Sequence, residues 1–268
     1  MPFASVNGCE LWFEDRGRAG LPAVVLVHGF PMDGRIWADL LDDLSISHRV
    51  IVPDLRGFGR SKSESPFTME SLADDLHALI AHVQIAPCVL AGLSMGGYAS
   101  LALARRRPAD LRGLILVDSR TDGDSAQTKV TRGEMIELAR SKGSEAITRA
   151  MLPRLLGPGA LANRPIVAKK LTEITHACPA LTIEHALAAM RDREDQTAWL
   201  AGANLPVHFI VGEEDAITPP ELAKEQAKKI GRGEVTVIAS AGHLTPLEQP
   251  ALTARAISEF VRGIKAPV

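Results

Sequence analysis

Short, uninterrupted runs of apolar residues alternate along this chain with longer amphipathic stretches, and this alternation restricts the fold more than any other feature. Each run is continuous rather than alternately apolar and polar, as in a strand covered on both faces of its sheet. Amphipathic helices between such strands favour an α/β fold with a mostly parallel central sheet and helices on both faces. The clearest predicted strands are residues 23–27, 49–52, 88–90, 114–117, 207–211 and 235–238.

The helices expected between these strands begin at recognisable residues. Leucines at helical spacing predict a helix over residues 70–83, for which Thr68 is a suitable N-cap. Pro219-Pro220 opens a second predicted helix, and a third occupies residues 250–264. Apolar residues on both sides of Asn7-Gly8 predict an antiparallel hairpin at one edge of the sheet.

One long stretch, residues 120–200, contains no convincing strand and shows only helical periodicity. Several prolines and glycines divide it, which predicts a series of short helices. The interrupting residues are Pro153, Gly157-Pro158-Gly159, Pro165 and Pro179. We therefore predict a core formed by residues 1–119 and 200–268, with residues 120–199 inserted in it as a helical cap.

Charge and composition exclude several classes of protein. A formal net charge of −2 gives no reason to expect nucleic acid or an acidic membrane surface as a partner. No apolar run approaches the roughly 18–20 residues of a membrane helix, and the first residues lack the pattern of a signal peptide. The cysteines, Cys9, Cys88 and Cys178, are odd in number and far apart, which favours a reducing compartment. We expect a cytoplasmic protein whose partner is a small molecule.

The motif Gly92-x-Ser94-x-Gly96 lies directly after a predicted strand and directly before a helical stretch, residues 98–107. A nucleophile in this setting occupies a strained turn, where the residues two before and two after it must be small. The positive end of the following helix points at the site and favours a developing oxyanion. A Gly-Ser-Gly turn without chemistry is the alternative, but the strand–turn–helix setting favours Ser94 as a nucleophile.

His28-Gly29 ends the first long central strand, where such a pair shapes a loop that supplies one donor of an oxyanion hole. We therefore expect the backbone N–H groups of Phe30 and Met95 to be the two donors. His28 is itself a possible base, but its position before a glycine favours a role in bracing the loop.

The candidates for a catalytic acid and base follow the later strands. Asp215 stands at the carboxyl end of one strand, where a carboxylate can orient an imidazole, and Glu213, Glu214 and Asp118 compete with it. His243 follows the last strand, behind a glycine that lets the chain turn, and is the best candidate base. His176 and Cys178 alone do not make a metal site, so we expect no metal and no organic cofactor.

Five stretches carry a resemblance to a known family. The sequence resembles the α/β-hydrolase superfamily, and within it the small esterases, the cofactor-free haloperoxidases and the 3-oxoadipate enol-lactonases. This resemblance implies the α/β-hydrolase fold, with the acid at Asp215, the base at His243 and the chain order Ser94, Asp215, His243. Asp118 stays the named alternative for the acid. The matching stretches are residues 28–31, 53–61, 91–97, 212–215 and 241–243.

Departures from neighbouring families narrow the expected activity. Haloalkane dehalogenases and epoxide hydrolases have an aspartate where this chain has Ser94, and the sole tyrosine, Tyr98, lies on the helix after Ser94 rather than in the cap. We expect hydrolysis of small carboxylic esters or lactones through an acyl-enzyme on Ser94. The residues expected to form the substrate-binding wall are Met32, Trp37 and Leu244.

Three alternatives stay open at this point. Enol-lactone hydrolysis would need a cationic cap residue to meet a substrate carboxylate, and Arg120, Arg149 and Arg191 are candidates. Perhydrolase activity would use the same three catalytic residues. A protein of another class, with the hydrolase fold but a ligand-binding or signalling role, would show little turnover. Neither the acyl-chain preference nor the oligomeric state follows from the sequence.

Overall fold

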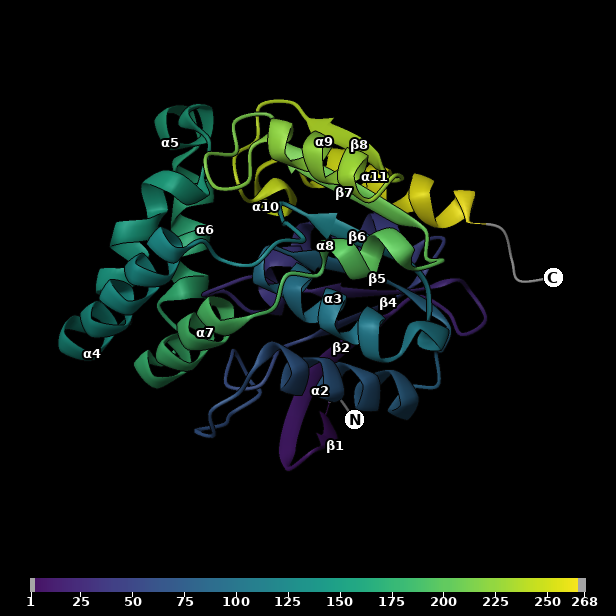
Figure 1. Ribbon diagram of the computed structural model, residues 1–268, viewed down its shortest axis with the longest axis horizontal. Helices are drawn as coiled ribbons and strands as arrows, with labels where there is room; N and C mark the ends of the chain where they lie inside the picture. Colours follow the sequence, from purple (N-terminus) through teal and green to yellow (C-terminus); the bar gives the residue numbers. More distant parts are fainter. Residues whose placement is uncertain (1–2, 265–268) are drawn as a thin grey trace.

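Within residues 3–264, the part of the chain that the computed structural model describes, eight strands form one sheet in the order β1-β2-β4-β3-β5-β6-β7-β8 (Figure 1). β2 pairs antiparallel with β1 and with β4, and the other neighbours pair parallel. The strands are β1 (Phe3–Val6), β2 (Cys9–Arg16), β3 (Ala23–Val27), β4 (Arg49–Pro53), β5 (Cys88–Leu93), β6 (Leu111–Val117), β7 (Val207–Gly212) and β8 (Glu234–Ile238). The six strands predicted from apolar runs are β3 to β8, which confirms the predicted fold class.

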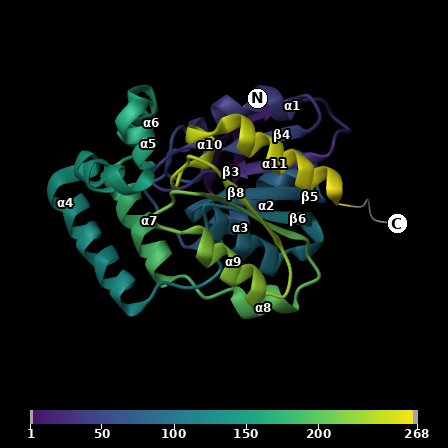
Figure 2. The same ribbon diagram turned by 90° about the horizontal axis from the view of Figure 1, so that it is seen from above.

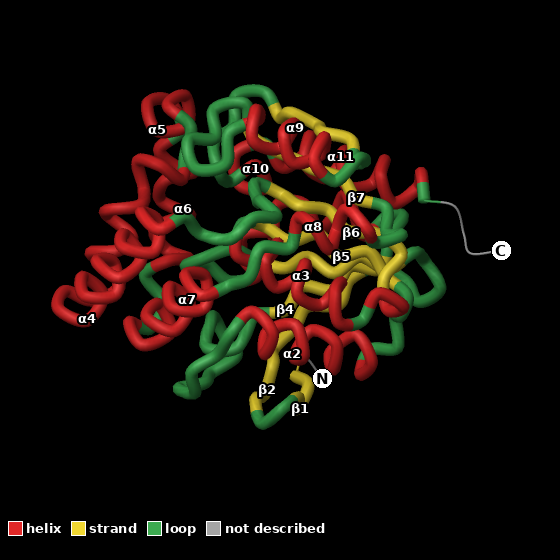
Figure 3. Tube along the Cα trace, viewed as in Figure 1, coloured by secondary structure: helices red, strands yellow, loops and turns green. Residues whose placement is uncertain are grey.

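Helices cover both faces of this sheet (Figure 3). One face carries α2 (Met69–His82), α3 (Met95–Arg106) and α9 (Pro220–Lys229). The other face carries the 3₁₀ helix η1 (Gly34–Leu40) with α1 (Leu41–Ser45), α10 (Thr245–Glu248) and α11 (Pro250–Gly263). A second 3₁₀ helix, η2 (Pro108–Asp110), precedes β6. No helix in the described part of the chain is both long enough and apolar enough to cross a membrane.

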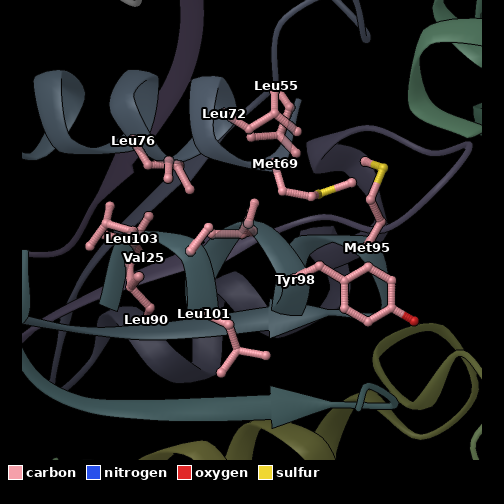
Figure 4. Packing of buried hydrophobic residues seen from close by; sticks show 14 of the residues in the cluster. Val25, Leu55, Met69, Leu72, Leu76, Leu90, Met95, Tyr98, Leu101 and Leu103 are labelled. Atoms are coloured by element: carbon pink, nitrogen blue, oxygen red, sulfur yellow. The ribbon is translucent and has the colours of Figure 1, made fainter. Parts of the chain in front are cut away.

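Alternate side chains of each central strand pack into two separate cores, one on each face of the sheet, because successive residues of a strand point to opposite faces. In β3, Val25 packs in the cluster that includes α2 and α3, whereas Val24 packs in the cluster that includes η1, α1 and α11. Figure 4 shows part of the first cluster, in which Leu72 and Leu76 extend from α2 toward the sheet. Burial on both faces explains why these strands read as continuous apolar runs.

The ends of several elements confirm the local sequence signals. Thr68 caps α2, and its hydroxyl accepts the N–H of Ser71 while the Ser71 side chain accepts the N–H of Thr68. α9 and α11 each begin at a proline, as predicted. The β1–β2 hairpin turns at Asn7-Gly8, where both residues have positive φ.

The segment between β6 and β7 forms α4 (Ala126–Leu155), α5 (Pro158–Asn163), α6 (Pro165–Thr175), α7 (Ala180–Asp192) and α8 (Thr197–Gly202). We call residues 126–192, which span α4 to α7, the helical insertion. Both views place it beyond one end of the sheet, with α4 packed along α7 (Figures 1 and 2). The predicted boundary between a core and a cap at residues 120–199 stays a prediction.

One predicted interruption is wrong. Pro158 and Pro165 begin helices and Pro179 caps α7, but Pro153 lies inside α4. The interruption of α4 falls instead at Gly143, whose φ of 75° and ψ of −176° are not helical. Pro153 lies two residues before the end of α4, so the hydrogen bond that its missing N–H would have made is lost from the last turn of the helix.

Candidate functional site

Ser94 lies in the sharp turn between β5 and α3, at φ 50° and ψ −112°. Its backbone is fixed on both sides, because its N–H donates to Val117 O (2.9 Å) and its carbonyl accepts from Gly97 N (2.9 Å). The glycines of the motif are needed at this turn. A Cβ on Gly92 would lie 2.5 Å from the carbonyl oxygen of Gly96, and one on Gly96 would lie 2.3 Å from that of Val27.

Ser94, His243 and Asp215 form a continuous hydrogen-bonded series at the carboxyl ends of the parallel strands. The Ser94 Oγ lies 2.9 Å from Nε2 of His243, and Nδ1 of His243 lies 2.8 Å from Oδ2 of Asp215. A carboxylate accepts hydrogen bonds, so the Nδ1 proton is donated to Asp215 and Nε2 is left to accept the Ser94 hydroxyl proton. The imidazole and the carboxylate are both buried.

Asp215 is held in place by the turn that follows it. Its Oδ1 accepts the N–H groups of Ile217 (2.7 Å) and Thr218 (2.9 Å), and its Oδ2 accepts the Thr218 hydroxyl (2.7 Å). Burial alone would raise the pKa of Asp215, but His243 and Thr218 lower it to about 2. Burial disfavours a charged imidazole, yet the pKa of His243 is raised above its ordinary value because the negative charge and hydrogen bond of Asp215 outweigh burial.

The structure does not bring the competing carboxylates to His243. Asp118 is buried, and its oxygens accept Gly212 N (2.9 Å), Thr245 N (2.9 Å) and the Thr245 hydroxyl (2.8 Å). Burial and the nearby charge of Asp215 raise the pKa of Asp118 to about 7. Asp118 therefore joins the ends of β6 and β7 to the segment after His243 and makes no hydrogen bond to the imidazole ring.

Glu213 and Glu214 are also placed away from the imidazole. The Glu213 carboxylate accepts the N–H of Ser240 (3.1 Å). The Glu214 carboxylate lies beside Gly157, where a Cβ would be 2.4 Å from its Oε2. Among the four candidate acids, Asp215 is the one hydrogen-bonded to His243.

His28 is buried and joins two loops. Its Nε2 accepts the N–H of Leu55 (2.9 Å), so its Nδ1 carries the proton and donates to the carbonyl of Gly29 (3.0 Å). Phe30 and Met95 flank Ser94 from the loop after β3 and from the first turn of α3. Neither of their backbone N–H groups has a hydrogen-bond acceptor within the described residues.

A cavity of about 350 Å³ opens onto Ser94 and His243. Its walls come from the loop after β3 through Phe30, from α7 through Met190, and mainly from α4. The residues that α4 contributes are Thr128, Thr131, Arg132, Met135, Ala150, Met151, Arg154 and Leu155.

The predicted wall residues Met32, Trp37 and Leu244 do not line this cavity. All three are buried in the core cluster that contains η1 and α11. Nearness in the sequence to Phe30 and His243 indicated the right loops, but these side chains pack in the core on one face of the sheet rather than in the cavity wall. The helical spacing of Met151, Arg154 and Leu155 is a signal that could have identified a wall on α4.

The cavity lining carries more positive than negative charge, because it contains three arginines and one acidic residue. Arg120 pairs with Asp122, and Arg132 pairs with Asp124 (3.0 Å), whereas Arg154 has no ion pair within the described residues. Asp124 is the acidic residue of the lining. The other two predicted cationic residues lie outside the lining on the surface: Arg149 pairs with Glu145, and Arg191 with Asp192. Sequence reasoning missed Arg132, Arg154 and Asp124.

Comparisons with known proteins agree with this fold. A family model described as "Alpha/beta hydrolase family" matches residues 24–256. The structure is similar to that of a thermophilic esterase from Thermogutta terrifontis, with 40% identity, a TM-score of 0.92 and coverage of 99% of this chain and 98% of that one. It is also similar to the enol-lactonase from Burkholderia xenovorans LB400, with 26% identity, a TM-score of 0.90 and coverage of 97% and 100%. A curated relative, the pimeloyl-[acyl-carrier protein] methyl ester esterase of Neisseria meningitidis serogroup C, is 27% identical over 259 residues, which are 93% of this chain and 98% of the relative.

Proposed function

This chain belongs to the alpha/beta hydrolase family, and from that premise we propose that it hydrolyses small carboxylic esters or lactones through an acyl-enzyme on Ser94. The observation that carries the proposal is the hydrogen-bonded series from Ser94 through His243 to Asp215. The helical insertion acts as a cap over the substrate in this proposal, and the enzyme works in the cytoplasm with Cys9, Cys88 and Cys178 as free thiols.

The proposed reaction proceeds in two steps. In the first, Nε2 of His243 takes the Ser94 hydroxyl proton while Oγ attacks the substrate carbonyl, and the imidazolium then gives that proton to the departing alkoxide. In the second, His243 takes a proton from water as the water attacks the acyl-enzyme, and the imidazolium then returns that proton to Ser94 Oγ as the acyl–Oγ bond breaks and the acid leaves. In a lactone the leaving alkoxide stays attached to the acyl group, so the product is a single hydroxy acid. Asp215 keeps the Nδ1 proton in place and stabilises the imidazolium.

The negative charge of the tetrahedral intermediate needs donors on the other side of the carbonyl. The N–H groups of Phe30 and Met95 are our assignment, since both residues flank Ser94 and neither amide is used by the described backbone. Met95 also begins α3, so the positive end of that helix adds to the stabilisation. Loss of one such donor typically costs about 3 kcal/mol of transition-state stabilisation.

The test is steady-state hydrolysis of p-nitrophenyl acetate, butyrate and octanoate by the wild type, Ser94→Ala and Ser141→Ala. Ser141 is an exposed serine on α4 whose hydroxyl bonds only its own helix, so Ser141→Ala is the control. We expect kcat to fall on the order of 10⁴-fold or more in Ser94→Ala alone. Retention of wild-type turnover by Ser94→Ala would rule out the proposed nucleophile. A burst followed by near-zero turnover in the wild type would favour the ligand-binding alternative.

Arg154 favours a second candidate function, the hydrolysis of esters or lactones that carry a carboxylate, as in enol-lactones. It lines the cavity, and no described acidic residue pairs with it. Monomethyl succinate and methyl butyrate are suitable matched substrates, because they differ mainly in the carboxylate. Arg154→Gln should raise the KM for monomethyl succinate by roughly 10-fold, the loss of one charge-assisted contact, and leave that for methyl butyrate unchanged. Equal effects on both esters would rule out this role of Arg154.

A further inference from the structure

Glu248 is a buried carboxylate that the proposed reaction does not use. It ends the short helix α10, and its side chain is fully buried. Its Oε1 accepts the N–H of Gly242 (2.8 Å), and its Oε2 accepts the N–H of Gly157 (2.9 Å). A buried carboxylate is costly unless such donors satisfy it, so its position calls for an explanation.

The two amides belong to different parts of the molecule. Gly242 directly precedes His243, whereas Gly157 belongs to the helical insertion and caps α5. Two residues before Gly157, the carbonyl of Leu155 accepts the N–H of His243 itself (3.1 Å). Leu155 also lines the cavity, so the segment that contacts His243 is a continuation of the substrate-binding wall.

The two segments touch backbone to backbone. A Cβ on Gly242 would lie 2.3 Å from Gly157 N and 2.7 Å from the carbonyl carbon of Leu156, so no side chain fits between them. Arg164, on the insertion, reaches over the same junction and donates to the carbonyls of Glu248 and Ser240. The His243 loop is therefore held to the insertion by Glu248 from the inside and by Arg164 from the outside.

We propose that Glu248 is a positioning residue, which orients His243 toward Ser94 by tying the His243 loop to the helical insertion. The inference rests on the proposed function for its catalytic consequence. Without the Glu248 carboxylate, the Gly242 and Gly157 amides lose their shared acceptor and the imidazole is no longer fixed between Asp215 and Ser94. A misplacement of about 1 Å at a reacting group can cost roughly 100-fold in rate.

The experiment compares Glu248→Gln, Arg164→Gln and the control Asp75→Asn with the wild type. Glutamine keeps one acceptor oxygen but turns an NH₂ group toward the second amide. Asp75→Asn also removes a buried carboxylate, one whose partners are Arg56 and Asn7 rather than the amides beside His243. We expect kcat for p-nitrophenyl butyrate to fall at least about 10-fold in Glu248→Gln and about 3-fold in Arg164→Gln, with KM changed less than about 3-fold. Asp75→Asn should lower Tm but keep kcat.

A spectroscopic measurement makes the result independent of turnover. The proton on Nδ1 of His243, hydrogen-bonded to Asp215, gives a downfield ¹H NMR signal that His243→Gln identifies by its loss. We expect this signal to shift or broaden in Glu248→Gln and Arg164→Gln and to stay unchanged in Asp75→Asn. The proposal would be overturned if a folded Glu248→Gln variant kept both the NMR signal and kcat unchanged. If Glu248→Gln does not fold, the same result in Arg164→Gln would overturn it. If Ser94→Ala keeps its activity while the signal still responds to Glu248→Gln, the proposed function fails and the positioning role stands.

Discussion

At the scale of single residues, the charge on His243 is set by its neighbours. Burial lowers the pKa of an imidazole, but Asp215, with a smaller effect from Asp118, raises the pKa of His243 above the ordinary value of 6.5. The base must be neutral to accept the Ser94 proton. It is neutral above its pKa, so kcat/KM should rise with pH through a midpoint above 6.5.

Asp215→Asn should change both the height and the position of this pH profile. The variant removes the charge that favours the imidazolium, so the pKa of His243 falls and the acid limb of kcat/KM moves to lower pH. The maximum rate should fall about 10⁴-fold, because an amide can present an N–H to Nδ1 and favour the wrong tautomer. The measurement is kcat/KM from about pH 5 to about pH 9. Glu213→Gln, on the exposed side of the same turn, is the control and should leave the acid limb in place. If Asp118→Asn displaced the acid limb and Asp215→Asn did not, Asp118 would be the acid.

At the scale of single elements, two glycines of α4 predict opposite effects of the same substitution. Gly133 has ordinary helical geometry, and a Cβ there meets no atom within 4 Å. Gly133→Ala should therefore raise the free energy of unfolding by about 1 kcal/mol. Gly143 has open space as well, but its φ of 75° with ψ of −176° is a conformation that glycine alone adopts readily. Gly143→Ala should lower the free energy of unfolding by about 1–3 kcal/mol.

Urea unfolding of the two alanine variants measures this difference. Since both glycines lie on one helix and neither Cβ would clash, the pair separates backbone conformation from packing. A gain of stability in Gly143→Ala would show that α4 runs straight through this residue in solution.

The sequence predicts those elements whose signals are local. Continuous apolar runs identified β3 to β8, and Thr68, Pro220 and Pro250 marked the starts of helices because capping and proline geometry act within one turn. The interruption of α4 was placed at Pro153 rather than Gly143, since a proline predicts a break more strongly than a glycine does. Its true position is at a glycine, the residue that adopts this backbone conformation most readily.

The site shows the same division between local and distant signals. The residues hydrogen-bonded in series follow three strands whose carboxyl ends share one edge of a parallel sheet, so topology predicted that Ser94, His243 and the candidate acids lie together. The resemblance to the α/β-hydrolase superfamily selected Asp215 among those acids. The cavity wall could not, because Arg154 and Leu155 reach Ser94 only through the packing of the insertion over the sheet. Met32 and Trp37 were misplaced because nearness in the sequence does not show which face of a sheet a side chain takes.

At the scale of the whole molecule, a buried ion pair joins the two ends of the helical insertion. Asp124 precedes α4 and Arg193 follows α7, and their side chains, each 4% exposed, meet at 2.6 Å. The Arg193 guanidinium also lies 3.9 Å from the centre of the Tyr98 ring, on α3 of the core. These contacts join both ends of the insertion to the sheet, so we expect insertion and sheet to unfold in one transition.

Asp124→Asn tests this coupling by removing the negative charge that pairs with Arg193 and Arg132, together with one of the two oxygens that accept from them. Breaking a buried pair from one side costs about 3–5 kcal/mol, which corresponds to a fall in Tm on the order of 10 °C for a chain of this size. Asp74→Asn, which breaks an exposed pair with Arg106, should cost less than about 1 kcal/mol. Scanning calorimetry measures both, and equal losses of Tm would contradict the assignment of Asp124–Arg193 as a structural anchor.

The buried cysteines have a consequence for following how the molecule opens. Cys9 lies in the edge hairpin, Cys88 in the centre of the sheet and Cys178 in the helical insertion, and all are buried free thiols. Burial raises the pKa of each, that of Cys88 to about 12, so the reactive thiolate is scarce in the folded protein. A thiol reagent can modify each position only when the surrounding structure opens. The order in which the three thiols react therefore gives the order in which hairpin, insertion and sheet open, without any label being introduced.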